Sequence, residues 1–250
     1  MRLKDKTAIV TGSSRGIGRA VALAFGREGA NVTVNYMASE RPAKEVVEAI
    51  EKEGGKAIAV KADVARKPEV EHLVSKTIEA FGRVDILVNN AGFTRPAMML
   101  EMTEDQWDEV LDIHLKGAFL CSQLVALKMK EQNSGKIINI TSVAGVVGTV
   151  GQVNYSAAKG GIISLTKSIA RELARYHICA NVISLGIVAT DMTEKIRINE
   201  KLRDIYLNRI LLKRFAEVDD ITPAFVFLAS DASNYITGQL ICVDGGYGMI

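Results

Sequence analysis

The stretch from Ser142 to Lys159 has the residue types and the spacing needed for proton transfer. Tyr155 and Lys159 stand four residues apart, so on a helix both side chains would lie on one face, one turn apart. A phenol is a poor acid, with a reference pKa of about 10, and a nearby cation lowers that pKa by stabilising the phenolate. The pair could then exchange a proton near neutral pH, with Ser142 hydrogen-bonding a carbonyl or alcohol oxygen. The ordinary alternative is an aromatic residue and a solvated lysine on an amphipathic helix.

A glycine-rich turn forms a second candidate site. Gly12, Gly16 and Gly18 lie between an apolar run, residues 7–10, and a helical pattern, residues 19–28. Glycines let the backbone turn sharply and approach a pyrophosphate, and the helix that follows offers free N–H groups and the positive end of its dipole. A plain strand–helix turn would look similar, but the position after the first strand favours a dinucleotide site.

Apolar runs and helical patterns alternate along the chain. Further strands are expected at 32–36, 57–60 and 84–88, separated by helices at 41–53 and 68–81. This alternation indicates βαβ units and a parallel sheet, and strands this apolar suit a sheet buried on both faces. With right-handed crossovers, the simplest arrangement is an α/β fold with a doubly wound sheet. Because no linker interrupts the pattern, one domain over residues 1–250 is expected.

The end of the second strand bears on the choice of cofactor. No acidic residue stands between Tyr36 and Glu40 to hold a ribose 2′-hydroxyl, whereas Arg15 and Arg41 could accept a 2′-phosphate. This favours NADP over NAD, unless both arginines are solvated surface charges. After the third strand, Asp63 could accept a hydrogen bond from the adenine amino group or simply end the strand.

Composition excludes several classes of protein. The chain has 250 residues, 48% of them hydrophobic, and a net charge of +2, which gives no argument for binding nucleic acid or an anionic membrane. We see no apolar run of the ~18 residues that span a membrane and no room for a signal peptide. Three scattered cysteines indicate neither a disulfide framework nor a metal site, and Cys179 and Cys242, in strand-like runs, are expected to be buried. A cytoplasmic location is expected.

Four motifs together resemble the short-chain dehydrogenase/reductase family: TGSSRGIG at 11–18, NNAG at 89–92, Ser142, and YSAAK at 155–159. They occur in that family's order and spacing, and the likeness covers essentially the whole chain. It implies a single Rossmann domain with about seven parallel strands and helices on both faces. Arg15, TDMT at 190–193 and the ending from 236 to 246 are most similar to the family's bacterial 3-oxoacyl-acyl-carrier-protein reductases.

The resemblance implies a role for each matching residue. Tyr155 would be the general acid in reduction, Lys159 would lower its pKa and hold the nicotinamide ribose, and Ser142 would orient the substrate oxygen. Besides Tyr155 and Lys159, the residues that would line the cofactor are Gly12, Ser14, Arg15, Gly16, Ile17, Gly18, Tyr36, Asp63, Val64, Asn89, Ala91, Gly92, Gly186, Val188 and Thr190.

Two positions depart from the family pattern. His114 stands where the family usually has an asparagine that supports a water in a proton relay. A histidine could do the same work with added pH sensitivity, or it could be a core residue satisfied by a backbone carbonyl. Leu185 stands where a proline is usual, which removes a constraint on φ and adds an N–H group that needs a partner.

The activity implied by the resemblance is NADPH-dependent reduction of a β-ketoacyl thioester, bound to acyl carrier protein or as a small molecule. The alternatives are a related enzyme acting on a sugar, a steroid or another small carbonyl, and a non-catalytic dinucleotide-binding protein. Residues 191–210 would form a mobile substrate lid, and Lys128, Lys130 and Arg175 are candidates for a basic rim that meets an acidic carrier. A homotetramer is expected.

Overall fold

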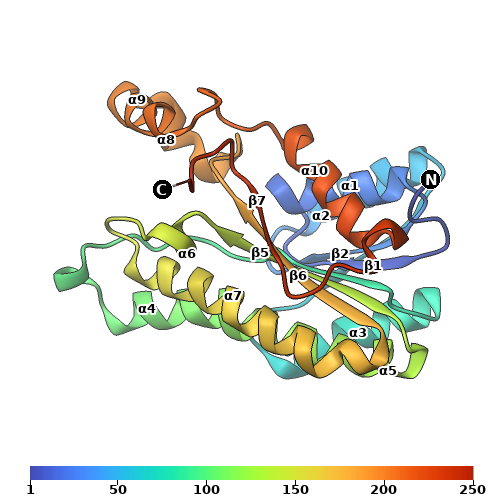
Figure 1. The fold of residues 1–250 in the computed structure, drawn as a ribbon. Coiled ribbons are helices and arrows are strands. Elements are labelled where there is room, and N and C mark those ends of the chain that lie inside the picture. The colour runs from blue at the N-terminus through green and yellow to red at the C-terminus, as the bar shows by residue number, and fades with distance from the viewer. Residues whose placement is uncertain (250) are drawn as a thin grey trace.

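The computed structural model describes residues 1–249, and its centre is one parallel sheet with the strand order β3-β2-β1-β4-β5-β6-β7 (Figure 1). The doubly wound sheet expected from the sequence is therefore confirmed, with seven strands. Their bounds are Thr7–Val10 (β1), Asn31–Tyr36 (β2), Lys56–Lys61 (β3), Ile86–Asn89 (β4), Gly135–Ser142 (β5), Ile178–Leu185 (β6) and Leu240–Val243 (β7).

Helices cover both faces of the sheet. Helices α1, α2 and α10 pack together on one face, and α3, α4, α5 and α7 pack together on the other (Figure 1). The helix bounds are Gly16–Arg27 (α1), Glu40–Lys52 (α2), Lys67–Phe81 (α3), Glu104–Leu111 (α4), Gly117–Gln132 (α5), Ala144–Val147 (α6), Val153–Leu173 (α7), Glu194–Ile198 (α8), Glu200–Arg209 (α9) and Val218–Ala229 (α10).

The hydrophobic core is split by the sheet into two clusters. In β1, Ala8 and Val10 belong to the cluster under α1 and α10, whereas Ile9 between them belongs to the cluster under α3 and α5. The same alternation places Leu87 of β4 on the face opposite its neighbours in that strand. Side chains of successive strand residues point to opposite faces, so both faces of these strands must be apolar.

The strand order reverses between β1 and β4, and this decides where a ligand can bind. Chain connections leave β1 toward β2 on one side and β4 toward β5 on the other, so the loops after β1 and β4 diverge to opposite faces. In open α/β sheets, ligands bind in the crevice that this divergence leaves at the carboxyl ends of the strands. The glycine turn follows β1 and the NNAG motif begins at the end of β4, so both motifs meet at this crevice.

One helical segment qualifies as a membrane span by length and composition within the described part of the chain. It runs from Glu104 to Gln132 through α4, a π-helical turn and α5, and its most apolar 18-residue window has a mean hydropathy of 1.4, which the sequence analysis missed. Half of that window is buried in the protein. Val125 and Met129 of α5 belong to the core cluster beneath the sheet. Packing against the sheet therefore accounts for the apolar character of this helix.

Candidate functional site

The glycine turn is held in place by three asparagine and threonine side chains. The Asn90 amide donates to the carbonyl oxygens of Thr11 (2.8 Å) and Gly12 (3.0 Å), and the Thr11 hydroxyl accepts from the backbone N–H groups of Asn90 and Ala91. From the other side, Asn35 of β2 accepts from the Gly12 N–H (3.0 Å) and donates to the Ala62 carbonyl (3.0 Å). Sequence reasoning missed Asn35, although a polar residue within an apolar strand was a signal.

The turn has no space for larger residues. A Cβ atom at Gly12 would lie 2.8 Å from the Ala91 Cα, and one at Gly18 would overlap the Asn90 amide. Helix α1 then begins at Gly16 with no side-chain cap and no acidic residue in its first turn. The first N–H groups of a helix have no partner within it, so this N-terminus fits an anion such as a dinucleotide pyrophosphate.

The two arginines that could accept a 2′-phosphate, Arg15 and Arg41, differ in whether an acidic side chain already pairs with them. Arg41 forms an ion pair with Glu45 on the same helix (3.0 Å), and 91% of its side chain is exposed, so it is a surface charge. Arg15 is exposed and has no acidic partner among the described residues. Tyr36 ends β2 and pairs with Lys61, the last residue of β3, which places a second positive charge nearby. Of the two arginines, Arg15 is therefore the remaining candidate for contact with a 2′-phosphate.

The two candidates for contact with the adenine, Asp63 and Val64, differ in which of their groups could reach a cofactor. The Asp63 carboxylate accepts from the Ala65 N–H (2.9 Å) and lies 3.6 Å from Arg66, so part of it caps its own turn. Val64 is buried in the core cluster under α3 and α5, and its side chain packs against Gly117. Only the backbone of Val64 could therefore face a cofactor.

Asn89 lies under the site as part of a buried network. Its amide donates to Asn139 (2.7 Å) and Ser122 (3.0 Å), and Asn139 in turn donates to the Thr166 hydroxyl (2.7 Å). These residues come from β4, α5, β5 and α7. The network therefore fixes α7 against the sheet. The Asn89 amide is used in this buried network and positions the elements that carry the site.

Helix α7 carries Tyr155 and Lys159 on the face that meets β5. The Lys159 ammonium donates to the Ile140 carbonyl (2.8 Å), and its Nζ lies 5.6 Å from the centre of the Tyr155 ring. Ser142, the last residue of β5, lies near enough to the Tyr155 hydroxyl to lower its pKa. Gly145 allows the close contact of α6 with α7, because a Cβ there would lie 2.6 Å from the Lys159 carbonyl carbon. The structure thus places Tyr155 and Lys159 on one face of α7, as their spacing predicted, with Ser142 near Tyr155.

The protonation of this group differs from the sequence-based expectation. Burial raises the pKa of Tyr155 to about 12, although the nearby Ser142 side chain lowers it in part. Burial also lowers the pKa of Lys159 to about 7. A lysine that is half-neutral at pH 7 and directed at a carbonyl does not act as a full positive charge on the phenol. The expected lowering of the Tyr155 pKa is therefore wrong, because desolvation dominates.

His114 lies in the site, within the π-helical turn Asp112–Lys116 that joins α4 to α5. Its ring meets Tyr155 edge to face, with 5.2 Å between ring centres, and fills the space beside Gly92. Nε2 lies 2.7 Å from the Phe93 carbonyl oxygen, whereas Nδ1 is buried without a partner among the described residues. Burial and the nearby Lys159 lower the pKa of His114 to about 3, so the ring is neutral. π-helical turns frequently occur at functional sites.

The loop after β6 closes the other side of the crevice. Leu185 pairs with Ser142 of β5 and with Val243 of β7, so the strand simply continues through the position of the usual proline. Gly186 packs against Asp244, where a Cβ would lie 2.9 Å from the Asp244 Cα. Val188 is buried behind this loop. Thr190 reaches the glycine turn, since its Cγ2 lies 3.9 Å from a Cβ placed on Gly16.

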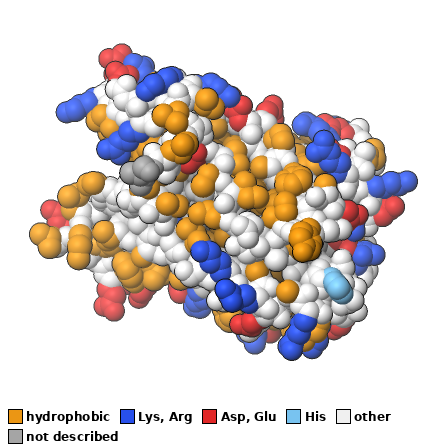
Figure 2. All heavy atoms as spheres, viewed as in Figure 1, with side chains coloured by type: hydrophobic (Ala, Val, Ile, Leu, Met, Phe, Trp, Pro, Cys, Tyr) orange, Lys and Arg blue, Asp and Glu red, His pale blue; other side chains and the backbone are white. Residues whose placement is uncertain are grey.

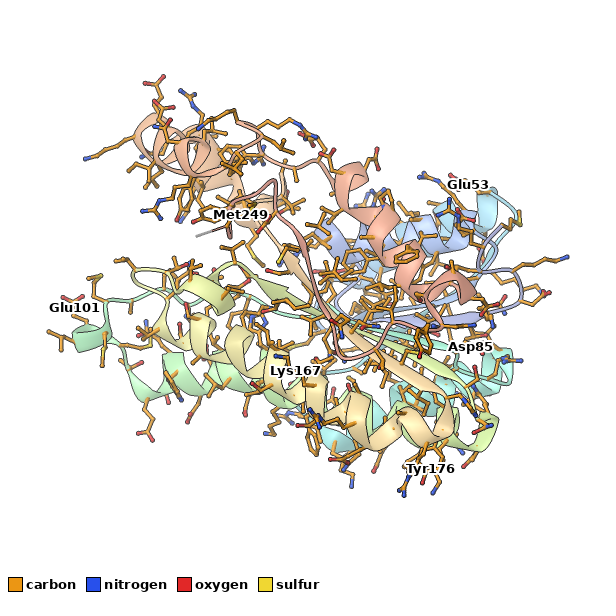
Figure 3. The ribbon with its side chains drawn as sticks, in the orientation of Figure 1. Glu53, Asp85, Glu101, Lys167, Tyr176 and Met249 are labelled. Carbon is orange, nitrogen blue, oxygen red and sulfur yellow. The ribbon has the colours of Figure 1, made fainter. Side chains whose placement is uncertain are left out.

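Two apolar walls flank the opening of the site, and Figure 2 shows hydrophobic side chains on both sides of the hollow. Segment 191–210, which contains α8 and α9, forms one wall; Glu101 marks the corner of the other wall in Figure 3. The exposed apolar residues of the first wall are Met192, Ile198, Leu202 and Ile205, and those of the second are Met98, Met99, Leu100, Val146, Val147 and Val150.

The residues of the candidate basic rim do not border the opening of the site. Lys130 and Arg175 both stack on the ring of Tyr176, which Figure 3 labels at the end of the molecule remote from the opening. Lys128 pairs with Glu131 on the same helix. These residues precede β5 and β6, whereas the site lies where those strands end. The expectation for Cys242 is also wrong, because it is exposed on the edge strand β7, and Cys179 is only half-buried.

With this geometry established, comparison with known proteins assigns the class. A family model described as "Enoyl-(Acyl carrier protein) reductase" matches residues 12–248. The chain belongs to the short-chain dehydrogenase/reductase family. It is 47% identical over 245 residues to the 3-oxoacyl-[acyl-carrier-protein] reductase FabG of Staphylococcus epidermidis, covering 98% of this chain and 100% of that protein. A reductase of the same name from Synechocystis sp. is also 47% identical, covering 99% and 98%.

Solved structures agree with this class. A gluconate 5-dehydrogenase from Burkholderia cenocepacia, in complex with NADP and tartrate, superimposes with a TM-score of 0.95 at 34% identity and covers 100% of this chain and 97% of that one. A putative short-chain alcohol dehydrogenase from Sinorhizobium meliloti has a TM-score of 0.94 at 38% identity, covering 98% and 97%.

Proposed function

We propose that this protein reduces a 3-oxoacyl thioester to the 3-hydroxyacyl thioester with NADPH, Tyr155 supplying the proton. The observation that carries the proposal is the group of Ser142, Tyr155 and Lys159 at the carboxyl ends of the strands, beside an uncapped helix N-terminus that fits a pyrophosphate. The names of the full-length relatives at 47% identity support the substrate class.

The protein's own residues supply positioning and a proton. Ser142 would hydrogen-bond the ketone oxygen, and Tyr155, with its pKa raised to about 12, is protonated at neutral pH and ready to act as an acid. Bound NADPH would supply the hydride for the ketone carbon. The proton from the Tyr155 hydroxyl would complete the alcohol as the carbonyl π bond breaks. The Lys159 ammonium, when charged, would stabilise the resulting phenolate.

Features around the adenine end support NADP as the cofactor. Arg15 is exposed beside the glycine turn with no acidic partner among residues 1–249, and the first acid after β2, Glu40, is paired with Lys44 (2.7 Å). A structural neighbour at 34% identity binds NADP. A guanidinium group suits a 2′-phosphate because it can donate two parallel hydrogen bonds.

The first experiment follows nicotinamide absorbance with acetoacetyl thioester, offering NADPH and NADH in parallel. We expect oxidation of NADPH well above that of NADH. Crotonyl thioester with NADPH and gluconate with NADP⁺, the hydride acceptor that its oxidation requires, serve as alternative substrates, because the matching family model is described as an enoyl reductase and one structural neighbour is a gluconate dehydrogenase. A higher kcat/KM on either of them would overturn the substrate assignment.

The matched variant is Tyr155→Phe, which removes one hydroxyl from a residue whose ring packs against His114. Turnover should fall by roughly 10²-fold or more, as expected for loss of a general acid, while NADPH still binds. Unchanged turnover in this variant would show the proposed proton donor to be wrong. A carrier-protein-bound substrate and a cytoplasmic setting remain predictions.

A further inference from the structure

Arg197 differs from the other cations of the segment 191–210. It lies on α8, and its Nη2 donates to the Thr190 carbonyl oxygen (3.1 Å). Its Nε atom is buried and has no hydrogen-bond partner among the described residues. Lys195 on the same helix is exposed, and Arg203 pairs with Asp204. The guanidinium group of Arg197 is therefore turned inward with an N–H donor unused.

The residue that Arg197 binds stands directly opposite the glycine turn. The Thr190 side chain is the nearest group to a Cβ placed on Gly16, at 3.9 Å, and Gly16 is the first residue of α1. That helix begins without a side-chain cap and without an acidic residue in its first turn. A single residue thus separates the Arg197 guanidinium from a helix N-terminus suited to phosphate.

Arg197 as a whole is half-buried, but its enclosed Nε–H has lost its bonds with water, and a donor left unused in this way is costly. Phosphate oxygens satisfy such donors well, since arginine binds them through its planar fork of N–H groups. The Thr190 carbonyl offers Arg197 only one neutral acceptor. An anion held at the start of α1, near the Thr190 side chain, would offer several charged acceptors.

We propose that Arg197 is a phosphate-binding residue of the lid, which donates to the pyrophosphate of the bound dinucleotide and so couples cofactor binding to closure of α8 and α9. This rests on the dinucleotide part of the proposed function and is independent of which carbonyl is reduced. A second source of the same chemistry is the phosphodiester of a carrier-bound or coenzyme A thioester. The contact between Thr190 and the glycine turn favours the cofactor.

The test compares Arg197→Gln with Lys195→Gln, which removes an exposed charge from the same helix. Calorimetric titration with NADPH gives a Kd without requiring turnover. A charge-assisted hydrogen bond contributes about 1.5–3 kcal/mol, so Arg197→Gln should raise the Kd roughly 10- to 100-fold. Lys195→Gln should stay within about twofold. Equal circular dichroism spectra and Tm values establish that both variants are folded, and Arg197→Lys, which keeps the charge but loses the fork, should fall between wild type and Arg197→Gln.

Two further measurements complete the test. Limited proteolysis of residues 191–210 should be slowed by NADPH in the wild type and in Lys195→Gln, but not in Arg197→Gln. An unchanged NADPH Kd in Arg197→Gln would overturn the proposal. So would a defect seen only as a higher KM for acetoacetyl-coenzyme A but not for the phosphate-free N-acetylcysteamine thioester, since that would assign Arg197 to the substrate. NADPH binding with inactivity on thioesters would sink the reductase assignment while leaving this inference intact.

Discussion

At the scale of single residues, burial of the Lys159 ammonium lowers the free energy of unfolding of the protein. Its side chain is enclosed between α7 and β5, its one recorded acceptor is the Ile140 carbonyl, and burial lowers its pKa to about 7. Below pH 7 the ammonium is charged in both the folded and the unfolded state, so the cost of burying it is fully present. Between about 7 and 10.5 the folded protein releases the proton first, so stability from this group rises with pH.

Lys159→Met should therefore abolish reduction and stabilise the fold. One unit of pKa shift corresponds to about 1.4 kcal/mol, so the gain in the free energy of unfolding should reach a few kcal/mol at pH 6–7 and shrink toward pH 10. Urea titrations of wild type and variant at both ends of that range measure it. A gain that does not change with pH would contradict the assigned cause. Lys167→Met, at an exposed position on the same helix, is the control.

His114 makes a prediction of the same sign in the acid range, because its pKa is also lowered. Its pKa falls from 6.5 to about 3, chiefly because it is buried. The unfolded chain takes up a proton as the pH falls through 6.5, whereas the folded protein stays neutral until about pH 3, so stability is lost over that window. His114→Asn, which cannot titrate, should lose less stability between pH 7 and 4.5. Denaturation curves at those two pH values test this, and parallel losses in both proteins would refute it.

At the scale of elements, the glycine turn depends on a residue of the neighbouring strand. Asn35 bonds both Gly12 and the Ala62 carbonyl from within β2, so it links the turn after β1 to the end of β3. The π-helical turn before α5 works in a similar way, since it directs His114 toward Gly92 and Tyr155. In each case the position of a site loop is determined by an element distant in sequence.

Asn35→Ala should weaken cofactor binding more than it slows the bound enzyme. Leaving the Gly12 N–H and the Ala62 carbonyl without this partner should cost about 1–3 kcal/mol of stability, and the NADPH Kd should rise. Asn31→Ala, at the half-buried start of the same strand, removes only a 3.4 Å contact with Thr7 and is the matched control. If Asn31→Ala raises the Kd equally, the effect belongs to the strand as a whole.

At the scale of the whole molecule, the two edges of the sheet differ. β3 ends one edge with exposed lysines, Lys56 and Lys61, a composition that opposes pairing with another strand. β7 ends the other edge half-exposed, and α10, which packs against β5 and β6, presents Phe227 to solvent. An open strand edge and an exposed aromatic side chain are consistent with the homotetramer that the family resemblance predicts.

Light scattering after gel filtration should therefore give four times the chain mass of 27.1 kDa. Phe227→Glu should reduce that mass, because a charge would be buried in the β7 and α10 contact. Leu100→Glu, an equally apolar and almost fully exposed residue at the cleft rim, should leave the mass unchanged. A wild-type mass of one chain would refute the prediction.

Local patterns in the sequence determined the alternation of strands and helices, the glycine turn after β1 and the helical spacing of Tyr155 and Lys159. These depend on residues close together in the chain, so periodicity and turn chemistry suffice to predict them. Helix boundaries shifted by one to three residues; α1, for example, begins within the glycine motif at Gly16.

Only the tertiary structure decided which distant residues meet and how strongly water is excluded from them. The bonds of Asn35 to the glycine turn and the neutral His114 beside Tyr155 join segments far apart in sequence. The pKa of Tyr155 was expected to fall because of a nearby cation, yet it rises. The physical reason is that spacing predicts proximity, whereas protonation depends on desolvation by every element packed around the site.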